Sequence, residues 1–281
     1  AARDRTTPIH MAGYLFVIGL LVASSGTNVG HELTHRKRNK FDMFMGNWLL
    51  ALTWDCAFAI EHVYGHHKYV ATPIDPATAK RGQNPYHFII RSSLLSHRNA
   101  WTIENNRLRK NGQNPFNVQN RMIIGYLRSG ILTTAAYFIS GWMGMIVFLL
   151  IGMGGKVTLE GVNYMEHYGL IREEGAPILP KHSWNTNRRI SSFFLYNLTR
   201  HSSHHENTSL EYWELKAYPD APEMPGGYLS CVYLVLFAPW LYHRIMAPKL
   251  KEWDQAFANQ QERELAKLQN IASGLPYLSP A

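Results

Sequence analysis

The sequence predicts an all-α, polytopic membrane protein, and three observations support that fold class. Apolar side chains make up 46% of the 281 residues and gather in long runs, unlike the dispersed pattern of a soluble core. Strand signals, meaning short alternating runs of β-branched and aromatic residues, are scarce. Nine of the 14 histidines fall into four short clusters, each beside an apolar or helical stretch. We therefore expect a single membrane-embedded domain over 1–281, in which a cap of helices carries the histidines.

The longest apolar runs predict the membrane spans. The first, 9–29, contains no acid or base except His10 and is long enough to cross a bilayer. A later run is about twice the length of one span. Small, turn-like residues interrupt that run at 140–144. We therefore expect a helical hairpin whose two spans lie at about 122–139 and 145–163.

The remaining helices are expected to stay outside the hydrocarbon core. If 41–60 crossed the bilayer, the histidine clusters before and after it would lie on opposite sides and could not share a site. We therefore expect it at the membrane face. The run 228–247 contains Pro239 and favours a buried or interfacial helix. Charged patterns predict solvated surface helices at 97–110 and 249–268.

The formal net charge of +8 is concentrated after the first span and in the polar stretch before the hairpin. The basic cluster that follows the first span consists of Arg36, Lys37, Arg38 and Lys40. By the positive-inside rule, the histidine-bearing cap is cytoplasmic. Contact with lipid head groups explains this charge, and a docking surface for an acidic protein is compatible with it. Nucleic acid is excluded as a partner because no basic module with interleaved aromatic residues is present.

Cysteine usage and the start of the sequence add two expectations. Cys56 and Cys231 lie far apart in apolar segments, so neither a disulfide framework nor a thiolate metal site is predicted. The first residues lack the pattern of a cleavable signal peptide. Because the sequence does not begin with Met, we expect upstream residues to be missing.

The histidine clusters have the composition of a metal centre. They consist of His31 and His35; His62, His66 and His67; His167; and His201, His204 and His205. Helical residues three or four apart share a face, so each cluster is expected to aim its imidazoles in one direction. One ion rarely takes more than four or five imidazoles, so nine indicate two ions. Zinc normally binds four ligands, so the count favours two iron ions.

Several polar residues near the clusters are candidates for orienting the imidazoles or completing a coordination sphere. These candidates are Glu32, Glu61, Asp75, Glu166 and His182. The pattern from His31 to His35 also fits a zinc metalloprotease with Glu32 as general base, but that reading leaves seven histidines without a role. A metal transporter would need ionisable residues within the spans, where they are scarce.

These motifs resemble those of a known family. The three multi-histidine clusters are similar to the histidine motifs of the membrane fatty-acid desaturase and hydroxylase superfamily, whose members are di-iron enzymes. The segments 163–169, 70–76 and 182–185 resemble more specifically the integral-membrane alkane 1-monooxygenases, or AlkB-type alkane hydroxylases. The likeness runs from about residue 13 to 248. Family members usually have six membrane helices, so about three are expected upstream of residue 1.

The resemblance implies a function and a set of partners. It implies terminal hydroxylation of medium- to long-chain n-alkanes to 1-alkanols with O₂, at two iron ions held by the nine histidines. Rubredoxin would supply the electrons and would be recharged by an NAD(P)H-dependent rubredoxin reductase. The implied location is the bacterial inner membrane, crossed several times, with the active site on the cytoplasmic side. A fatty-acyl desaturase or hydroxylase is the alternative, with the same metal cage.

Overall fold

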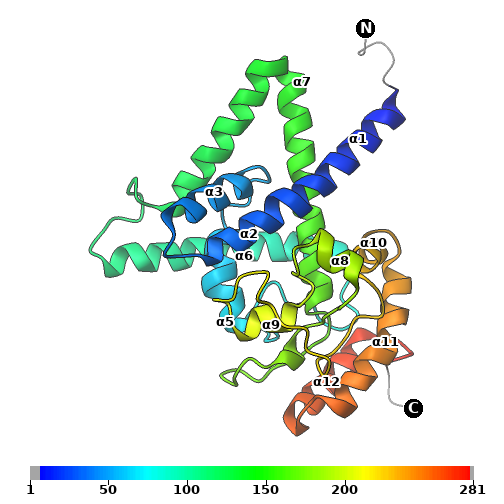
Figure 1. Ribbon diagram of the computed structural model, residues 1–281. Coiled ribbons are helices and arrows are strands. Elements are labelled where there is room, and N and C mark those ends of the chain that lie inside the picture. Colours follow the sequence, from blue (N-terminus) through cyan, green and yellow to red (C-terminus); the bar gives the residue numbers. More distant parts are fainter. Residues whose placement is uncertain (1–6, 279–281) are drawn as a thin grey trace. The chain divides into compact units, whose positions relative to one another are not determined.

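The computed structural model describes residues 7–278, and across that range every regular element is a helix (Figure 1). Extended pairing within it is limited to an isolated bridge between Asn185 and Glu223. The all-α prediction is confirmed. The described residues fold as two compact units, each built from two separate stretches of chain. Unit 1 contains 7–61 and 100–159, and unit 2 contains 62–99 and 160–278.

Unit 1 contains the helices of the first part of the chain. They are α1 (Pro8–Leu21), η2 (Val22–Thr27), α2 (Asn28–His35), α3 (Lys40–Ala51) and α4 (Phe58–Glu61). Two long helices, α6 (Pro85–Lys110) and α7 (Arg121–Glu166), belong partly to each unit.

Unit 2 contains shorter helices joined by loops. They are η3 (His62–His66), α5 (His67–Tyr69), η4 (Pro180–His182), α8 (Arg189–Phe194), α9 (His201–Glu206), α10 (Tyr228–Phe237), α11 (Pro239–Ala256) and α12 (Gln260–Ser273).

Two helical stretches of the described residues are long and apolar enough to cross a membrane, Pro8–His35 and Arg121–Glu166. The second reverses direction at Ser140 (φ −146°, ψ 25°) and Gly141 (φ 62°, ψ −153°), and Figure 1 shows its two legs. Glycine adopts a positive φ without the steric cost that a Cβ imposes. The chain therefore turns where the small residues of 140–144 predicted it. The limits of the individual spans stay a prediction.

The segment 41–60 is divided between two helices. α3 contains 12 residues and ends at Ala51, and Trp54 adopts a positive φ of 56° before α4 begins. A helix of that length measures about 18 Å, well short of a hydrocarbon core of about 30 Å. It packs closely on α2, because a Cβ on Gly30 would lie 3.1 Å from the carbonyl oxygen of Gly46. α3 alone is therefore too short to cross a bilayer, and the place of 41–60 at the membrane face stays a prediction.

The charged helix predicted at 97–110 begins 12 residues earlier, at Pro85. The side chain of Asn84 accepts hydrogen bonds from the backbone N–H groups of Tyr86 and His87, which caps the first turn. Charge pattern alone located only the more polar, C-terminal part of the helix.

The prediction of one solvated helix at 249–268 is wrong. α11 ends at Ala256, and α12 begins after Asn259, whose side chain accepts from the backbone N–H of Glu262. Trp253 and Glu262 are buried. The tail therefore packs into unit 2 instead of lying in solvent. The earlier run 228–247 is likewise two helices, separated at Ala238.

Gly125 is expected to be intolerant of substitution. A Cβ there would lie 2.2 Å from the Cβ of Cys56, so alanine should lower the free energy of unfolding by about 1–3 kcal/mol. Thermal unfolding in detergent measures this. Gly130→Ala is the matched control, because a Cβ at Gly130 meets nothing within 4 Å. Equal melting temperatures for the two variants would show that the contact at Cys56 is not tight.

Candidate metal centre

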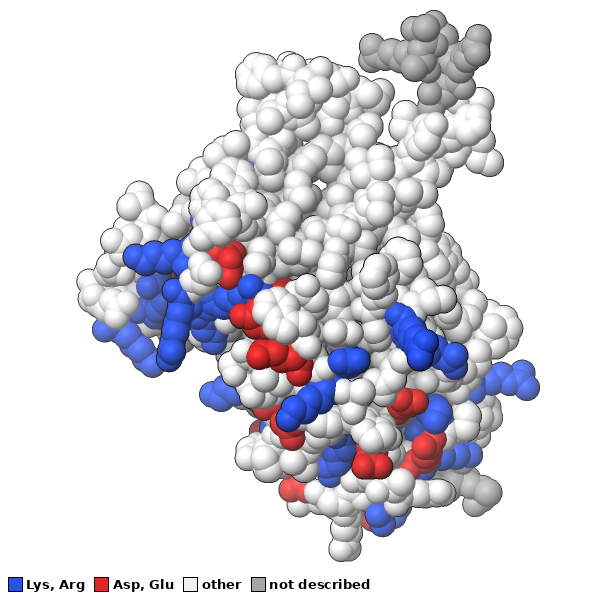
Figure 2. All heavy atoms as spheres, viewed as in Figure 1, with Lys and Arg blue, Asp and Glu red and all other residues white. Residues whose placement is uncertain are grey.

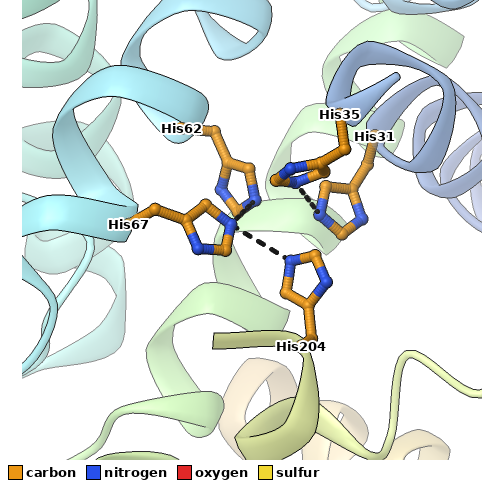
Figure 3. A group of neighbouring side chains, drawn as sticks. All are labelled: His31, His35, His62, His67 and His204. Atoms are coloured by element: carbon orange, nitrogen blue, oxygen red, sulfur yellow. Dashed lines mark hydrogen bonds between the residues drawn. The ribbon is translucent and has the colours of Figure 1, made fainter. Parts of the chain in front are cut away.

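Unit 2 holds seven of the nine histidines, in two groups. The first group consists of His62, His67 and His204, whose nitrogens lie within 4.8 Å of one another. The Nε2 of His67 lies 3.0 Å from that of His62 and 3.1 Å from that of His204 (Figure 3). All three side chains are buried.

The second group brings four nitrogens together, those of His66, His167, His201 and His205, again within 4.8 Å of one another. The Nε2 of His201 lies 3.1 Å from that of His167 and 3.0 Å from that of His205. None of the four residues is more than 4% exposed. They come from η3, from the bend directly after α7, and from α9.

The clusters are divided between the two groups, and this corrects the expectation that each cluster aims in one direction. The rings of His62 and His66 lie side by side, 5.1 Å apart, as expected for residues four apart. Their nitrogens nevertheless belong to different groups. The reason is that His62–His66 forms a π-helix, whose i→i+5 turn brings His67 onto the same side as His62.

Helix α9 divides its histidines in the same way. His201 and His205 are four residues apart and share the second group, while the adjacent His204 belongs to the first. One helix of six residues therefore contributes to both groups.

Unit 1 holds the remaining pair, His31 and His35. Their Nε2 atoms lie 3.1 Å apart on one face of α2, which confirms the expected i,i+4 arrangement (Figure 3). The ring of His31 packs edge-on against Phe58, with centroids 5.7 Å apart.

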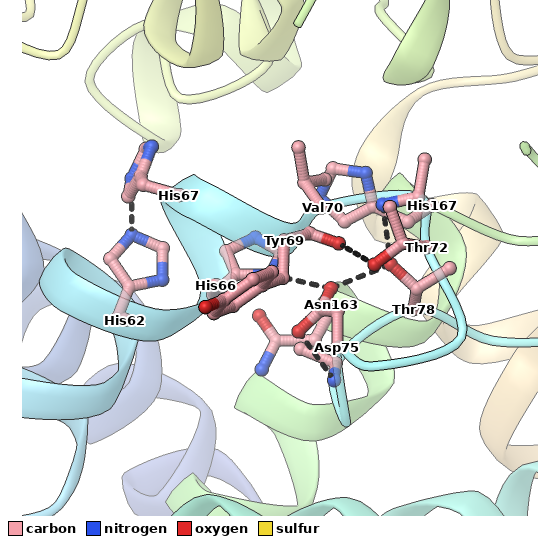
Figure 4. A network of polar contacts seen from close by, with 12 residues as sticks. His62, His66, His67, Tyr69, Val70, Thr72, Asp75, Thr78, Asn163 and His167 are labelled. Atoms are coloured by element: carbon pink, nitrogen blue, oxygen red, sulfur yellow. Dashed lines mark hydrogen bonds and ion pairs between the residues drawn. The ribbon is translucent and has the colours of Figure 1, made fainter. Parts of the chain in front are cut away.

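Asp75 orients His66. Its Oδ2 lies 2.9 Å from His66 Nδ1 and also accepts from the hydroxyl of Thr78, while Oδ1 accepts from the N–H of Ala77 (Figure 4). Burial opposes ionisation of this carboxyl group, but His66 and Thr78 outweigh it and hold the pKa of Asp75 below its usual value. Because Nδ1 donates to Asp75, the lone pair of His66 is on Nε2.

His182 orients His167 through its backbone. The Nδ1 of His167 donates to the carbonyl oxygen of His182 at 3.1 Å, which leaves the Nε2 lone pair toward His201. The His182 ring is held at both nitrogens: Nδ1 accepts from the N–H of Leu179, and Nε2 donates to Glu262 at 3.1 Å. Glu262 of α12 thus positions His182, and His182 in turn positions His167 of the second group.

The other predicted carboxylates have different surroundings. Glu166 Oε2 lies 3.4 Å from Nε2 of His201, the same atom that faces the other histidines of the second group. Glu166 therefore lies on the metal-binding side of the His201 ring, where it could bind the ion directly, and not on the Nδ1 side, where it could only orient the ring. Glu61 is buried directly before His62. The carboxylate of Glu32 lies 3.1 Å from the guanidinium of Arg36.

The histidines of unit 2 fit bound metal. Burial lowers the pKa of His167 to about 3 and that of His205 well below its usual value, so both are neutral at pH 7 and have a lone pair to donate. Two nitrogens that bind one ion through bonds of about 2.1 Å lie about 3–4 Å apart. The spacings of 3.0 and 3.1 Å therefore allow the nitrogens of each group to share an ion.

Sequence reasoning missed Glu262. Its carboxylate accepts from His182, from Lys181 and from the N–H of Asn259. The Asn-x-x-Glu spacing from 259 is a capping-box signal and could have located the start of α12. No local pattern could have indicated the contact with His182, 80 residues earlier.

Replacing Glu262 with glutamine is expected to lower stability in a pH-dependent way. Burial raises the pKa of this carboxyl group, but its hydrogen bonds with His182 and Lys181 prevail and lower it to about 2 from 4.5. The carboxylate therefore contributes roughly 3 kcal/mol above pH 4.5, which is lost as the pH falls toward 2. Melting temperatures at pH 7 and pH 3.5 test this, with exposed Glu264→Gln as control. If the melting temperature of Glu262→Gln lies as far below that of the parent at pH 3.5 as at pH 7, the carboxylate charge does not explain the loss of stability.

Comparisons with known proteins show the family of the chain. The sequence profile of the fatty acid desaturase family matches residues 7–234. That range contains all nine histidines.

Individual relatives are similar over most of their length. Alkane 1-monooxygenase 1 of Pseudomonas aeruginosa is 38% identical over 90% of this chain and 69% of its own length. Alkane 1-monooxygenase 2 of Alcanivorax borkumensis is 32% identical over 92% of this chain and 69% of its own length. The hydroxylase component of a xylene/toluene monooxygenase of Pseudomonas putida is 34% identical over 97% of this chain and 73% of its own length. The chain is therefore a membrane enzyme of the fatty acid desaturase family and belongs, within it, to the alkane 1-monooxygenases.

Proposed function

We propose that this protein hydroxylates the terminal methyl group of medium- to long-chain n-alkanes. In that reaction R–CH₃, O₂, two electrons and two protons give R–CH₂OH and H₂O. The observation that carries the proposal is the pair of histidine groups in unit 2, found in a chain 38% identical to an alkane 1-monooxygenase. An apolar substrate is consistent with the two long apolar helices.

We propose iron for both histidine groups. Two bound iron ions would supply the oxidising chemistry with O₂, which no side chain of the chain can supply. Imidazole is a ligand suited to iron, and the nitrogens of each group are close enough to share one ion. The carboxylate of Glu166 offers the second group a further oxygen ligand.

We extend the ligand set to His31 and His35, which would complete the first group. Their paired Nε2 atoms have the same 3.1 Å spacing as the other ligand pairs. His31 also packs on Phe58, and Phe58 is one turn before His62 in the continuous helical stretch from α4 to α5. All nine histidines would then bind metal.

The residues of the chain would prepare the site for this reaction. Asp75 and the carbonyl of His182 keep one tautomer of His66 and His167, with Nε2 toward the metal. Burial of the second group excludes water, which would otherwise compete for the ligand positions and quench the oxidant.

Rubredoxin is the electron donor we propose, recharged by an NAD(P)H-dependent reductase. The support is charge: rubredoxins are acidic, whereas this chain carries a net charge of +8. The same excess of Lys and Arg beside the membrane segments supports a cytoplasmic active site in the bacterial inner membrane.

A second candidate substrate is the methyl group of an aromatic ring. It is favoured by the 34% identity to the xylene/toluene monooxygenase component, which covers 97% of this chain. Oxidation of an aryl methyl group would need the same metal ligands, so the histidines do not separate the two substrates.

Metal analysis and product analysis on one preparation test the proposal. The purified chain should contain about two irons and, with rubredoxin and its reductase, convert octane to 1-octanol. Toluene and a fatty-acyl lipid serve as parallel substrates. Benzyl alcohol as the main product would support the aromatic candidate, and a desaturated or hydroxylated acyl chain would support the desaturase alternative. One zinc per chain with no iron would overturn the oxygenase proposal.

A further inference from the structure

Unit 1 contains a pocket of about 340 Å³ that combines basic and apolar walls. Its lining includes the cations Lys37, Lys40, Arg121 and Arg128 and the apolar residues Phe44 and Ile124. It includes none of the nine histidines, so it is not part of the metal centre. In Figure 2 basic side chains gather at this side of unit 1, while the α7 turn is free of charged residues.

Arg128 is an unusual residue for its position. It lies about two turns into α7, within the span predicted at 122–139, and is partly buried. Arg121, at the start of the helix, pairs with Glu104 at 2.7 Å. Within the part of the chain that the structure describes, neither Arg128 nor Lys40 forms a salt bridge. Arg128 is thus a cation inside a predicted membrane span without a carboxylate partner, which indicates an anionic ligand from outside the protein.

An apolar groove of about 510 Å³ lies on the same leg of α7. Its lining includes Leu127, Ile131 and Phe138, which are 62%, 57% and 81% exposed. Arg128 of the pocket lies between Leu127 and Gly130 of the groove in the sequence, so the groove and the pocket lie on adjoining faces of one leg. A ligand with a charged head and a long apolar chain matches both.

We propose that this pocket and groove form a binding site for an anionic phospholipid. Its phosphate contacts Arg128 and Lys40, and an acyl chain follows the groove along α7. A guanidinium binds a phosphate through two parallel hydrogen bonds, and basic pockets between membrane helices suit anionic head groups. A soluble phosphate compound would leave the groove exposed, and a neutral lipid would leave Arg128 without a counter-ion.

Lipid titration of the full-length, detergent-solubilised protein tests the proposal. Binding of dioleoyl phosphatidylglycerol is measured by native mass spectrometry and by the rise in melting temperature, with dioleoyl phosphatidylcholine and inorganic phosphate in parallel. Arg128→Gln and Lys40→Gln are each expected to weaken phosphatidylglycerol binding about tenfold, because each removes a charged hydrogen bond. Arg38→Gln, a neighbouring exposed cation outside the pocket, is the matched control and should bind as the parent does.

Each outcome of the titration decides the proposal. Selective binding of phosphatidylglycerol, weakened in Arg128→Gln and Lys40→Gln but not in Arg38→Gln, supports it. Equal binding of the two lipids would show an apolar groove without head-group recognition and would overturn it. Phosphate that displaces the lipid at millimolar concentration would assign the pocket to a soluble anion. If Arg128→Gln does not fold, Lys40→Gln decides, and unchanged binding in that variant overturns the proposal.

Discussion

Replacing His167 with alanine is expected to empty the second histidine group and to abolish hydroxylation. His167 is fully buried, and its Nε2 lies 3.1 Å from that of His201, so alanine removes a buried nitrogen ligand from the group. Bound iron should fall from about two per chain to about one. Activity should fall by more than about 100-fold, because loss of a mere orienting group already costs 10- to 100-fold. Metal analysis and alkanol formation measure the two effects.

His243→Ala is the matched control for this experiment. His243 is also a buried histidine of unit 2, but its ring bonds to the hydroxyl of Tyr164 and belongs to neither group. That variant should keep both irons even if its melting temperature falls. Full iron occupancy and activity in His167→Ala would remove His167 from the ligand set.

Replacing Asp75 with asparagine is expected to weaken metal binding 10- to 100-fold without removing a ligand. The amide can still accept from Nδ1 of His66, but it carries no charge to strengthen the basicity of the ring. The rate of iron loss to a chelator should therefore rise, and activity should fall in proportion.

Asp254→Asn is the control for the loss of a carboxylate charge. Asp254 pairs with buried Arg81 at 2.6 Å and has no contact with the histidines, so its loss should lower stability and leave iron retention unchanged. If both variants lose iron at the same rate, destabilisation explains the effect and Asp75 has no specific role.

The local part of the site could be predicted from the sequence. His31 and His35 are four apart on a regular helix, so their shared face follows from the helical period alone. The turn of α7 at Gly141 follows from small residues in the middle of an apolar run twice the length of a span. In each case neighbouring residues in the sequence carry the whole signal.

The division of the histidines between two groups could not be predicted. It depends on the π-helix at His62–His66, and no residue pattern of that segment distinguishes a π-helix from an α-helix beforehand. Such wide turns persist where packing and ligands compensate for them, which is information from the rest of the fold. The contact of Glu262 with His182 could not be predicted either, because partners far apart in the sequence share no local pattern.

The shared segments have a consequence for how the site assembles. The helical stretch from His62 to His67 serves both histidine groups, and so does α9. An ion bound in one group fixes backbone that the other group also needs, so the entropy cost of ordering those segments is met by the first ion alone. Metal uptake should therefore be cooperative when both groups are intact, and an ion left alone in the first group, as in His167→Ala, should be bound more weakly than in the parent.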